Sequence, residues 1–166
     1  EAMQEKQTTI GKETFPMQKP FFVMATQNPI ESSGVYPLPE AQLDRFLFKM
    51  YIGYPTMEDE SMIIDQNITT RRFEDFDIKS VIKPSRLLDM QNAAKKIIIK
   101  DEIKKYITRI VDATRNPGKY GIKSGYYVEY GSSPRAAISL AIAARAEALL
   151  SGKTYVLPQY VKDVAH

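Results

Sequence analysis

The sequence contains no cysteine and only one histidine, His166, among its 166 residues. These absences exclude disulfides, thiolate metal sites and any Ser-His or His-metal cluster within the chain. No apolar run approaches the roughly 18 residues that a membrane span needs, and the first residues lack the pattern of a secretory signal peptide. We therefore expect a protein of the reducing cytoplasm that does not insert into membranes.

An excess of charge of one sign is also lacking, because 23 Lys+Arg stand against 20 Asp+Glu for a net charge of +3. This balance gives little support for nucleic acid or an anionic membrane as the main partner. A nucleic-acid binder is the weakest of three functional hypotheses, and a salt-sensitive shift of DNA or RNA would support it. The lysine-rich residues 95–105 are expected to form a solvated helix face, since Asp101 and Glu102 interrupt the positive charge.

The first third of the chain predicts short β-structure. Residues 1–6 are typical of the end of a helix whose start is missing, which suggests a fragment. The β-prone runs on either side of Gly11-Lys12 predict a hairpin. The apolar residues 21–26 predict a buried strand that Pro29 ends, because proline has no N–H for a ladder. After a loop and a short helix over residues 40–45, residues 46–52 predict a second buried strand.

Everything beyond Pro55 is predicted to be mainly helical. Thr56 and Asp59 are typical of a helix start. Residues 97–99 are β-branched and predict a short extended connector, and residues 118–131 predict a loop or irregular hairpin. The helices are expected over residues 56–67, from 84, over 101–116, over 133–152 and from 158. The apolar stripe of the third, Ile103, Ile107, Ile110 and Val111, predicts its buried face.

Three polar residues are candidates for chemistry. Asn28 follows a predicted strand, and ligands of open α/β sheets sit outside the carboxyl ends of strands. Arg45 lies at the end of the helix that follows. Arg135 lies in the first turn of a helix that Ser133 can cap, and helix N-termini attract phosphate. The plain alternatives are an asparagine that caps a strand, an arginine that binds helix-end carbonyls, and a solvated surface arginine.

The stretches ATQNPIE (residues 25–31), YPLPEAQLDRF (36–46) and GSSPRA (131–136) carry a family resemblance. The chain resembles the MoxR family of AAA+ ATPases along its whole length. The resemblance implies an α/β end of a P-loop NTPase (AAA+) core over residues 1–55, followed by an all-α helical lid over 56–166, and therefore a mostly α chain.

The resemblance also implies roles for the three candidates. Asn28 corresponds to sensor 1, which orients the attacking water or contacts the γ-phosphate. Arg45 corresponds to the arginine finger, which acts on the nucleotide of a neighbouring subunit, and Arg135 corresponds to sensor 2 of the lid. The implied ligands of the intact protein are ATP and Mg²⁺. The implied partners are other copies of itself, in a ring expected to be a hexamer, and a client protein.

The sequence lacks a Walker A lysine and a Walker B Asp-Glu pair. Residues 151–154, SGKT, imitate the end of a P-loop, but Glu147 stands where the first glycine is needed. Residues 63–66 imitate half of a Walker B strand but belong to a predicted helix. We therefore predict that the chain alone neither binds ATP tightly nor hydrolyses it. The alternative function is a non-enzymatic helical module for protein interaction.

The same absence leaves the two predicted strands without the core strand that lies between them in AAA+ sheets. Exposed apolar strand edges seek another chain. We expect residues 1–55 to pair in a non-native way, to exchange with another copy, or to be completed by an N-terminal segment outside this sequence.

Overall fold

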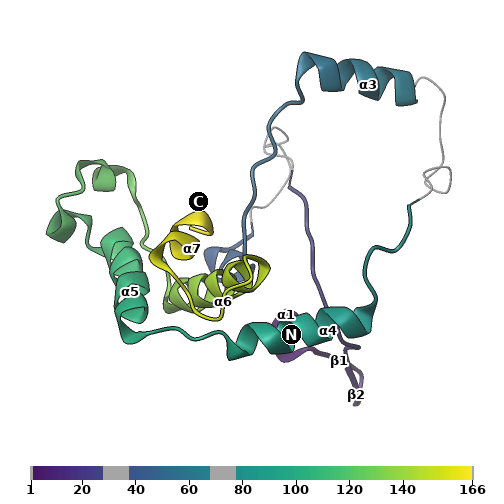
Figure 1. Ribbon diagram of the computed structural model, residues 1–166, viewed down its shortest axis with the longest axis horizontal. Helices are drawn as coiled ribbons and strands as arrows, with labels where there is room; N and C mark the ends of the chain where they lie inside the picture. The colour runs from purple at the N-terminus through teal and green to yellow at the C-terminus, as the bar shows by residue number, and fades with distance from the viewer. Residues whose placement is uncertain (1, 28–37, 68–77, 166) are drawn as a thin grey trace. The chain divides into compact units, whose positions relative to one another are not determined.

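The computed structural model describes residues 2–27, 38–67 and 78–165 (Figure 1). The chain divides into two units: Phe48–Lys83 is one, and Glu1–Leu47 together with Pro84–His166 is the other. These units are defined by contacts within the chain and do not test the boundary between core and lid that the sequence predicts at residue 55. That boundary stays a prediction. No helix among the described residues has the length and apolar character to cross a membrane.

The N-terminal segment folds as a helical turn and a hairpin. Helix α1 (Ala2–Glu5) leads into β1 (Gln7–Ile10), which pairs antiparallel with β2 (Glu13–Pro16). Gly11 has φ 65°, a left-handed conformation that glycine adopts at little cost, and it sits in the connecting turn. The predicted helix end and hairpin are confirmed.

The two predicted buried strands are wrong. Residues 21–26 and 46–52 contain no β-strand, and the sheet of the described residues consists of β1 and β2 alone. Phe22 is 84% exposed and Ile52 is 91% exposed. A strand is defined by the hydrogen bonds of its neighbour, so apolar composition cannot make one where no neighbouring strand is present. The hypothesis that another segment completes these residues stays open.

Helix α2 (Glu40–Leu43) is one turn long and confirms the predicted helix over 40–45, with an earlier end. Pro39 precedes it, as suits a residue with a fixed φ and no N–H to satisfy. After its last residue the chain keeps turning, because Arg45 N–H donates to the Gln42 carbonyl at 3.2 Å. Asp44 and Arg45 therefore project from the end of α2.

The unit Phe48–Lys83 contains helix α3 (Met57–Asn67). The Asp59 amide donates to Thr56 Oγ1 at 3.2 Å, and the Thr56 amide donates to Asp59 Oδ2 at 3.3 Å. This reciprocal arrangement satisfies two amides at the start of the helix, as a capping box does. The predicted helix start is confirmed.

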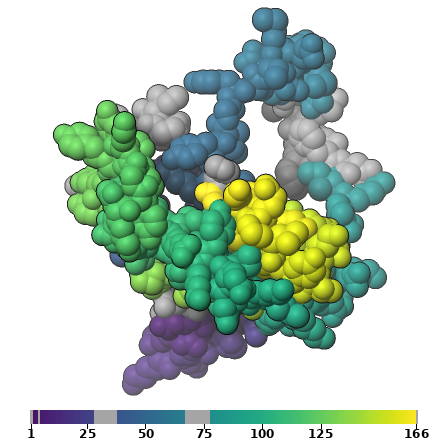
Figure 2. Space-filling model, turned by 60° about the vertical axis from the view of Figure 1, so that its left-hand side comes forward, coloured from purple at the N-terminus to yellow at the C-terminus, as the bar shows by residue number. Residues whose placement is uncertain are grey.

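The other unit is built around helix α6 (Pro134–Leu150), which packs against α4 (Pro84–Lys96), α5 (Asp101–Arg115) and α7 (Pro158–Asp163). In Figure 2 the green α5 region and the yellow C-terminal region form one continuous mass. The predicted stripe of α5 is confirmed, with Ile110 half-buried beside its three buried members. The core residues come from α5, α6, α7 and the connectors: Ile97, Ile103, Ile107, Ala144, Ala148, Val156 and Val161.

Two connectors hold the bundle together. Ile98 forms an isolated parallel bridge with Tyr155, in which the Ile98 amide donates to the Thr154 carbonyl at 3.0 Å. This confirms the extended connector predicted for residues 97–99. The predicted loop over residues 118–131 is more regular than expected, since η2 (Pro117–Tyr120) and η3 (Lys123–Tyr127) are 3₁₀ turns.

Candidate functional site

The structure describes two of the three candidate residues. Asn28 lies outside the described residues. Arg45 follows α2 with its side chain exposed. Arg135 lies in the first turn of α6 with 45% of its side chain exposed. Neither arginine is buried in the bundle.

The start of α6 has the geometry that its sequence predicts. Ser133 has an extended backbone (φ −71°, ψ 167°), and its Oγ accepts a hydrogen bond from the Arg135 amide at 3.1 Å. Pro134 occupies the first helical position, where its missing N–H costs nothing. This cap satisfies one of the free amides of the helix start. It also fixes the direction in which the Arg135 side chain leaves the helix.

Asp44 connects this helix start to the end of α2. The Ser133 hydroxyl lies 2.7 Å from each carboxylate oxygen of Asp44, and Arg135 Nη1 donates to Asp44 Oδ2 at 3.3 Å. The Asp44 side chain is only 28% exposed. The carboxylate therefore lies against the positive end of the α6 dipole, where an anion is favoured.

Asp44 was missed by the sequence reasoning. It stands in the LDRF motif directly before Arg45, but 89 residues separate it from Ser133. A possible signal was the motif itself, because a carboxylate next to a candidate arginine invites the question of what it contacts. Asp44, the residue directly before Arg45, therefore contacts Arg135.

The end of α5 holds Ser132, the residue directly before the cap residue Ser133. Arg115 Nε donates to the Ser132 carbonyl at 2.6 Å, and the Ser132 amide donates to Thr114 Oγ1 at 2.9 Å. A Cβ on Gly131 would lie 2.6 Å from Arg115 Cα, so the chain can pass this close to α5 only as glycine. These contacts place the cap residue relative to the bundle core.

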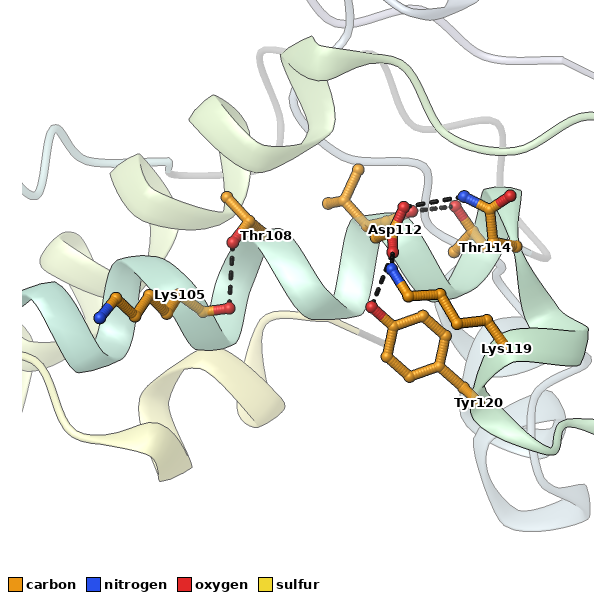
Figure 3. A network of polar contacts seen from close by, with 8 residues as sticks. Lys105, Thr108, Asp112, Thr114, Lys119 and Tyr120 are labelled. Atoms are coloured by element: carbon orange, nitrogen blue, oxygen red, sulfur yellow. Dashed lines mark hydrogen bonds and ion pairs between the residues drawn. The ribbon is translucent and has the colours of Figure 1, made fainter.

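A second polar cluster surrounds Asp112 of α5 (Figure 3). Its carboxylate accepts hydrogen bonds from Lys119 Nζ at 2.8 Å, Tyr120 Oη at 2.7 Å and Asn116 Nδ2 at 2.8 Å. These donors, led by Lys119, hold the pKa of Asp112 well below its usual range. In return, the Asp112 carboxylate raises the pKa of Lys119 and that of Tyr120. The cluster fastens η2 to α5, and the sequence reasoning did not anticipate it.

An apolar cavity of about 350 Å³ lies between the end of α5 and the η2–η3 segment. Its lining is mostly aliphatic, and Tyr126 and Tyr127 of η3 are largely exposed. The lining residues are Ile110, Ala113, Thr114, Pro117, Ile122, Ser124, Gly125 and Val128. Within the described ranges, no three acidic or histidine side chains are grouped so that they could hold a metal ion.

Comparisons with known proteins agree with this picture. Residues 1–48 match the family described as "ATPase family associated with various cellular activities (AAA)", and residues 124–166 match the AAA lid domain. The chain is 46% identical over 167 residues to Chaperone MoxR1 of Mycobacterium tuberculosis, an alignment that covers 99% of this chain and 43% of that protein. The chain belongs to the MoxR family of AAA+ ATPases.

Further relatives of this MoxR-family chain give the same result. The Bacillus subtilis protein YeaC is 40% identical over 165 residues, which cover 99% of this chain and 48% of YeaC. The crystal structure of a Cytophaga hutchinsonii protein superposes with a TM-score of 0.85 at 41% identity, over 99% of this chain and 49% of the other. The chain thus spans about half the length of the curated relatives that it matches.

The fold class predicted from the resemblance is confirmed: this is the end of an AAA+ core followed by a helical lid, and the chain is mostly helical. The two matched segments contain the candidate residues. Asn28 and Arg45 fall within residues 1–48, and Arg135 falls within residues 124–166.

Proposed function

We propose that this chain forms part of a longer MoxR-type ATPase and supplies accessory contacts to the terminal phosphate of ATP. In the intact protein, ATP and water become ADP and phosphate at the interfaces of a ring, for which a hexamer is the expected size. The work of the ring is the chaperone-like remodelling of a client protein. The relative named Chaperone MoxR1 supports the last part of this proposal.

The position of Arg135 carries the proposal. Its guanidinium leaves the capped start of a 17-residue helix, and that helix end already binds the carboxylate of Asp44. A cation and a helix N-terminus that together hold one anion have the chemistry to hold a phosphate. We assign Arg135 the sensor 2 role on this ground and on the GSSPRA motif.

Arg45 is proposed as the finger. No hydrogen bond or ion pair engages its exposed side chain within the described part of the chain, so its guanidinium is available to a neighbouring subunit. An arginine finger stabilises the charge of the phosphoryl-transfer transition state and is worth roughly 10³–10⁵ in rate. Asn28 is proposed as sensor 1, since an amide can donate and accept at once without titrating.

The proposal that the intact protein binds ATP and Mg²⁺ rests on the family to which the chain belongs. Guanidinium groups fit a phosphate, whereas Mg²⁺ needs oxygen ligands, and the described residues contain no cluster of three or more acidic or histidine side chains that could hold a metal ion. We therefore expect the ligands of Mg²⁺ and the phosphate cradle to come from other segments of the protein. By the same reasoning, the 166-residue chain alone should show no ATP turnover.

The test is steady-state ATPase kinetics of the whole protein. Arg135→Ala and Arg45→Ala should each lower kcat/KM, the second by roughly 10³ or more if it removes a transition-state contact. Arg86→Ala is the matched control, because the side chain of this exposed arginine of α4 makes no hydrogen bond or ion pair within the described residues. Equal activities of all three variants would overturn the proposal.

A mixing experiment tests the ring. Arg45→Ala subunits keep their own nucleotide site, and subunits without the phosphate-binding lysine keep their finger. Mixed rings should regain activity that neither variant has alone, because each supplies what its neighbour lacks. Failure to regain activity in rings shown to contain both subunits would exclude a finger that acts in trans.

The apolar cavity favours a second candidate, the non-enzymatic interaction module. A cavity of about 350 Å³ beside exposed tyrosines can accept an apolar side chain of a partner. The module alone, without ATPase activity, would be favoured if Ile122→Asp abolished client remodelling while Arg135→Ala left it intact. The reverse result would favour the ATPase.

A further inference from the structure

We propose that Asp44 is a positioning residue that competes with the terminal phosphate for Arg135, and that this exchange links the lid to the segment carrying Arg45. The inference rests on the proposed function of Arg135. Among the described residues, the ion-pair partner of the Asp44 carboxylate and the hydroxyl that donates to it, Arg135 and Ser133, both come from the start of α6.

The contacts of Asp44 form a closed set. Ser133 Oγ accepts from the Arg135 amide and donates to the Asp44 carboxylate, and Arg135 Nη1 donates to the same carboxylate. The Asp44 carboxylate thus accepts hydrogen bonds from both the Ser133 hydroxyl and the Arg135 guanidinium. A phosphate oxygen approaching Arg135 would meet the same guanidinium with more negative charge.

The strengths of the two Asp44 contacts differ. The Ser133 contact is short, at 2.7 Å, and half-buried, whereas the Arg135 contact is 3.3 Å long and almost half-exposed. Solvent screens the second contact more than the first. The arginine can therefore leave Asp44 for a phosphate while the serine keeps α2 attached to α6.

This division gives Asp44 two separable effects. Held by Ser133, it keeps the start of α6 against the turn from which Arg45 projects. Held by Asp44, Arg135 is unavailable to nucleotide until the phosphate displaces the carboxylate. Binding of nucleotide then changes the contacts of Asp44. Because Asp44 directly precedes Arg45 in the chain, this change occurs next to the proposed finger.

Two substitutions separate these effects. Asp44→Asn keeps an oxygen that can accept from Ser133 but removes the charge that holds Arg135. Asp44→Ala removes both contacts. Glu40→Gln is the matched control, because Glu40 is an acidic residue of the same helix, and its side chain contacts no other described residue by hydrogen bond or ion pair.

The first measurement is ATPase kinetics of the whole protein. Asp44→Asn should lower KM for ATP about two- to fivefold with kcat within twofold, the size expected for releasing a partly exposed ion pair. Asp44→Ala should lower kcat about tenfold or more, because Arg45 loses its fixed position relative to the lid. Glu40→Gln should change neither constant. An unchanged or raised KM in Asp44→Asn would overturn the competition.

The second measurement is hydrogen exchange of the nucleotide-free protein. Asp44→Ala should accelerate exchange of the Arg135 and Ala136 amides, and Glu40→Gln should not. If Arg135→Ala leaves the kinetics unchanged while this acceleration is seen, the proposed function fails but the contact stands. If Arg135→Ala impairs ATPase and Asp44→Asn leaves KM as it was, the role of Asp44 alone fails.

Discussion

Replacement of Ser133 tests whether the helix cap and the contact with Asp44 are separate contributions to stability. Ser133→Ala removes an acceptor for the Arg135 amide and a hydroxyl donor to Asp44. Loss of a serine cap costs about 0.5–2 kcal/mol. A hydrogen bond to a charged group contributes about 1.5–3 kcal/mol, and the lower end applies because Asp44 retains contact with water.

The two terms are not additive, since one hydroxyl makes both contacts. We expect Ser133→Ala to reduce the free energy of unfolding by about 1–3 kcal/mol. Urea unfolding of the chain, followed by circular dichroism, measures this loss. With a slope of about 1–3 kcal/mol/M, a loss of 2 kcal/mol lowers the midpoint by about 1 M.

Ser132→Ala is the control for this experiment, because Ser132 contacts its neighbours through backbone atoms that alanine retains. Ser133→Asp then separates the two terms. Aspartate caps a helix as well as serine does, but here it would place a carboxylate against that of Asp44. We expect Ser133→Asp to be at least as unstable as Ser133→Ala. Stability equal to that of the wild type would refute the contact with Asp44.

Three further substitutions test the bundle. Ile107→Ala should cost about 2–5 kcal/mol of unfolding free energy, because Ile107 is buried, whereas exposed Ile138→Ala should cost less than about 0.5 kcal/mol. Asp112 has a depressed pKa when folded, so its contribution should be complete above the ordinary carboxyl pKa near 3.8 and fall as the pH drops below it. Stability of Asp112→Asn should lack that acid-dependent part. Gly131→Ala should destabilise the chain through its clash with α5, whereas Gly118→Ala meets no atom within 4 Å and should not, as thermal unfolding of the pair would show.

Local signals predicted the helices well. The start of α6 was predictable because its signals lie within three consecutive residues. Ser133 accepts a hydrogen bond from the Arg135 amide, and Pro134 has no amide N–H that would need a partner. Gly152, with φ 68°, marks its end for the same local reason. The stripe of α5 was predictable because the period of a helix places Ile103, Ile107 and Val111 on one face.

Non-local contacts account for what the sequence did not predict. The apolar residues 21–26 and 46–52 were expected to be strands, but strand formation requires a partner and the described residues provide none. Asp44 was missed because its partners lie 89 and 91 residues away. The Asp112 cluster depends on the turn of η2, which brings Lys119 and Tyr120 back over α5.

The electrostatics of the α6 start favour the proposed exchange of Asp44 and a phosphate there. An arginine in the first turn of a helix opposes the dipole, at a cost of about 0.3–1 kcal/mol on an exposed surface. Asp44 offsets this cost because its carboxylate accepts from both the cap and the arginine. Loss of the carboxylate without a replacement would leave a cation at the positive end of the dipole. The site is therefore more stable with an anion present; Asp44 supplies it in this structure, and a phosphate would supply it in the proposed exchange.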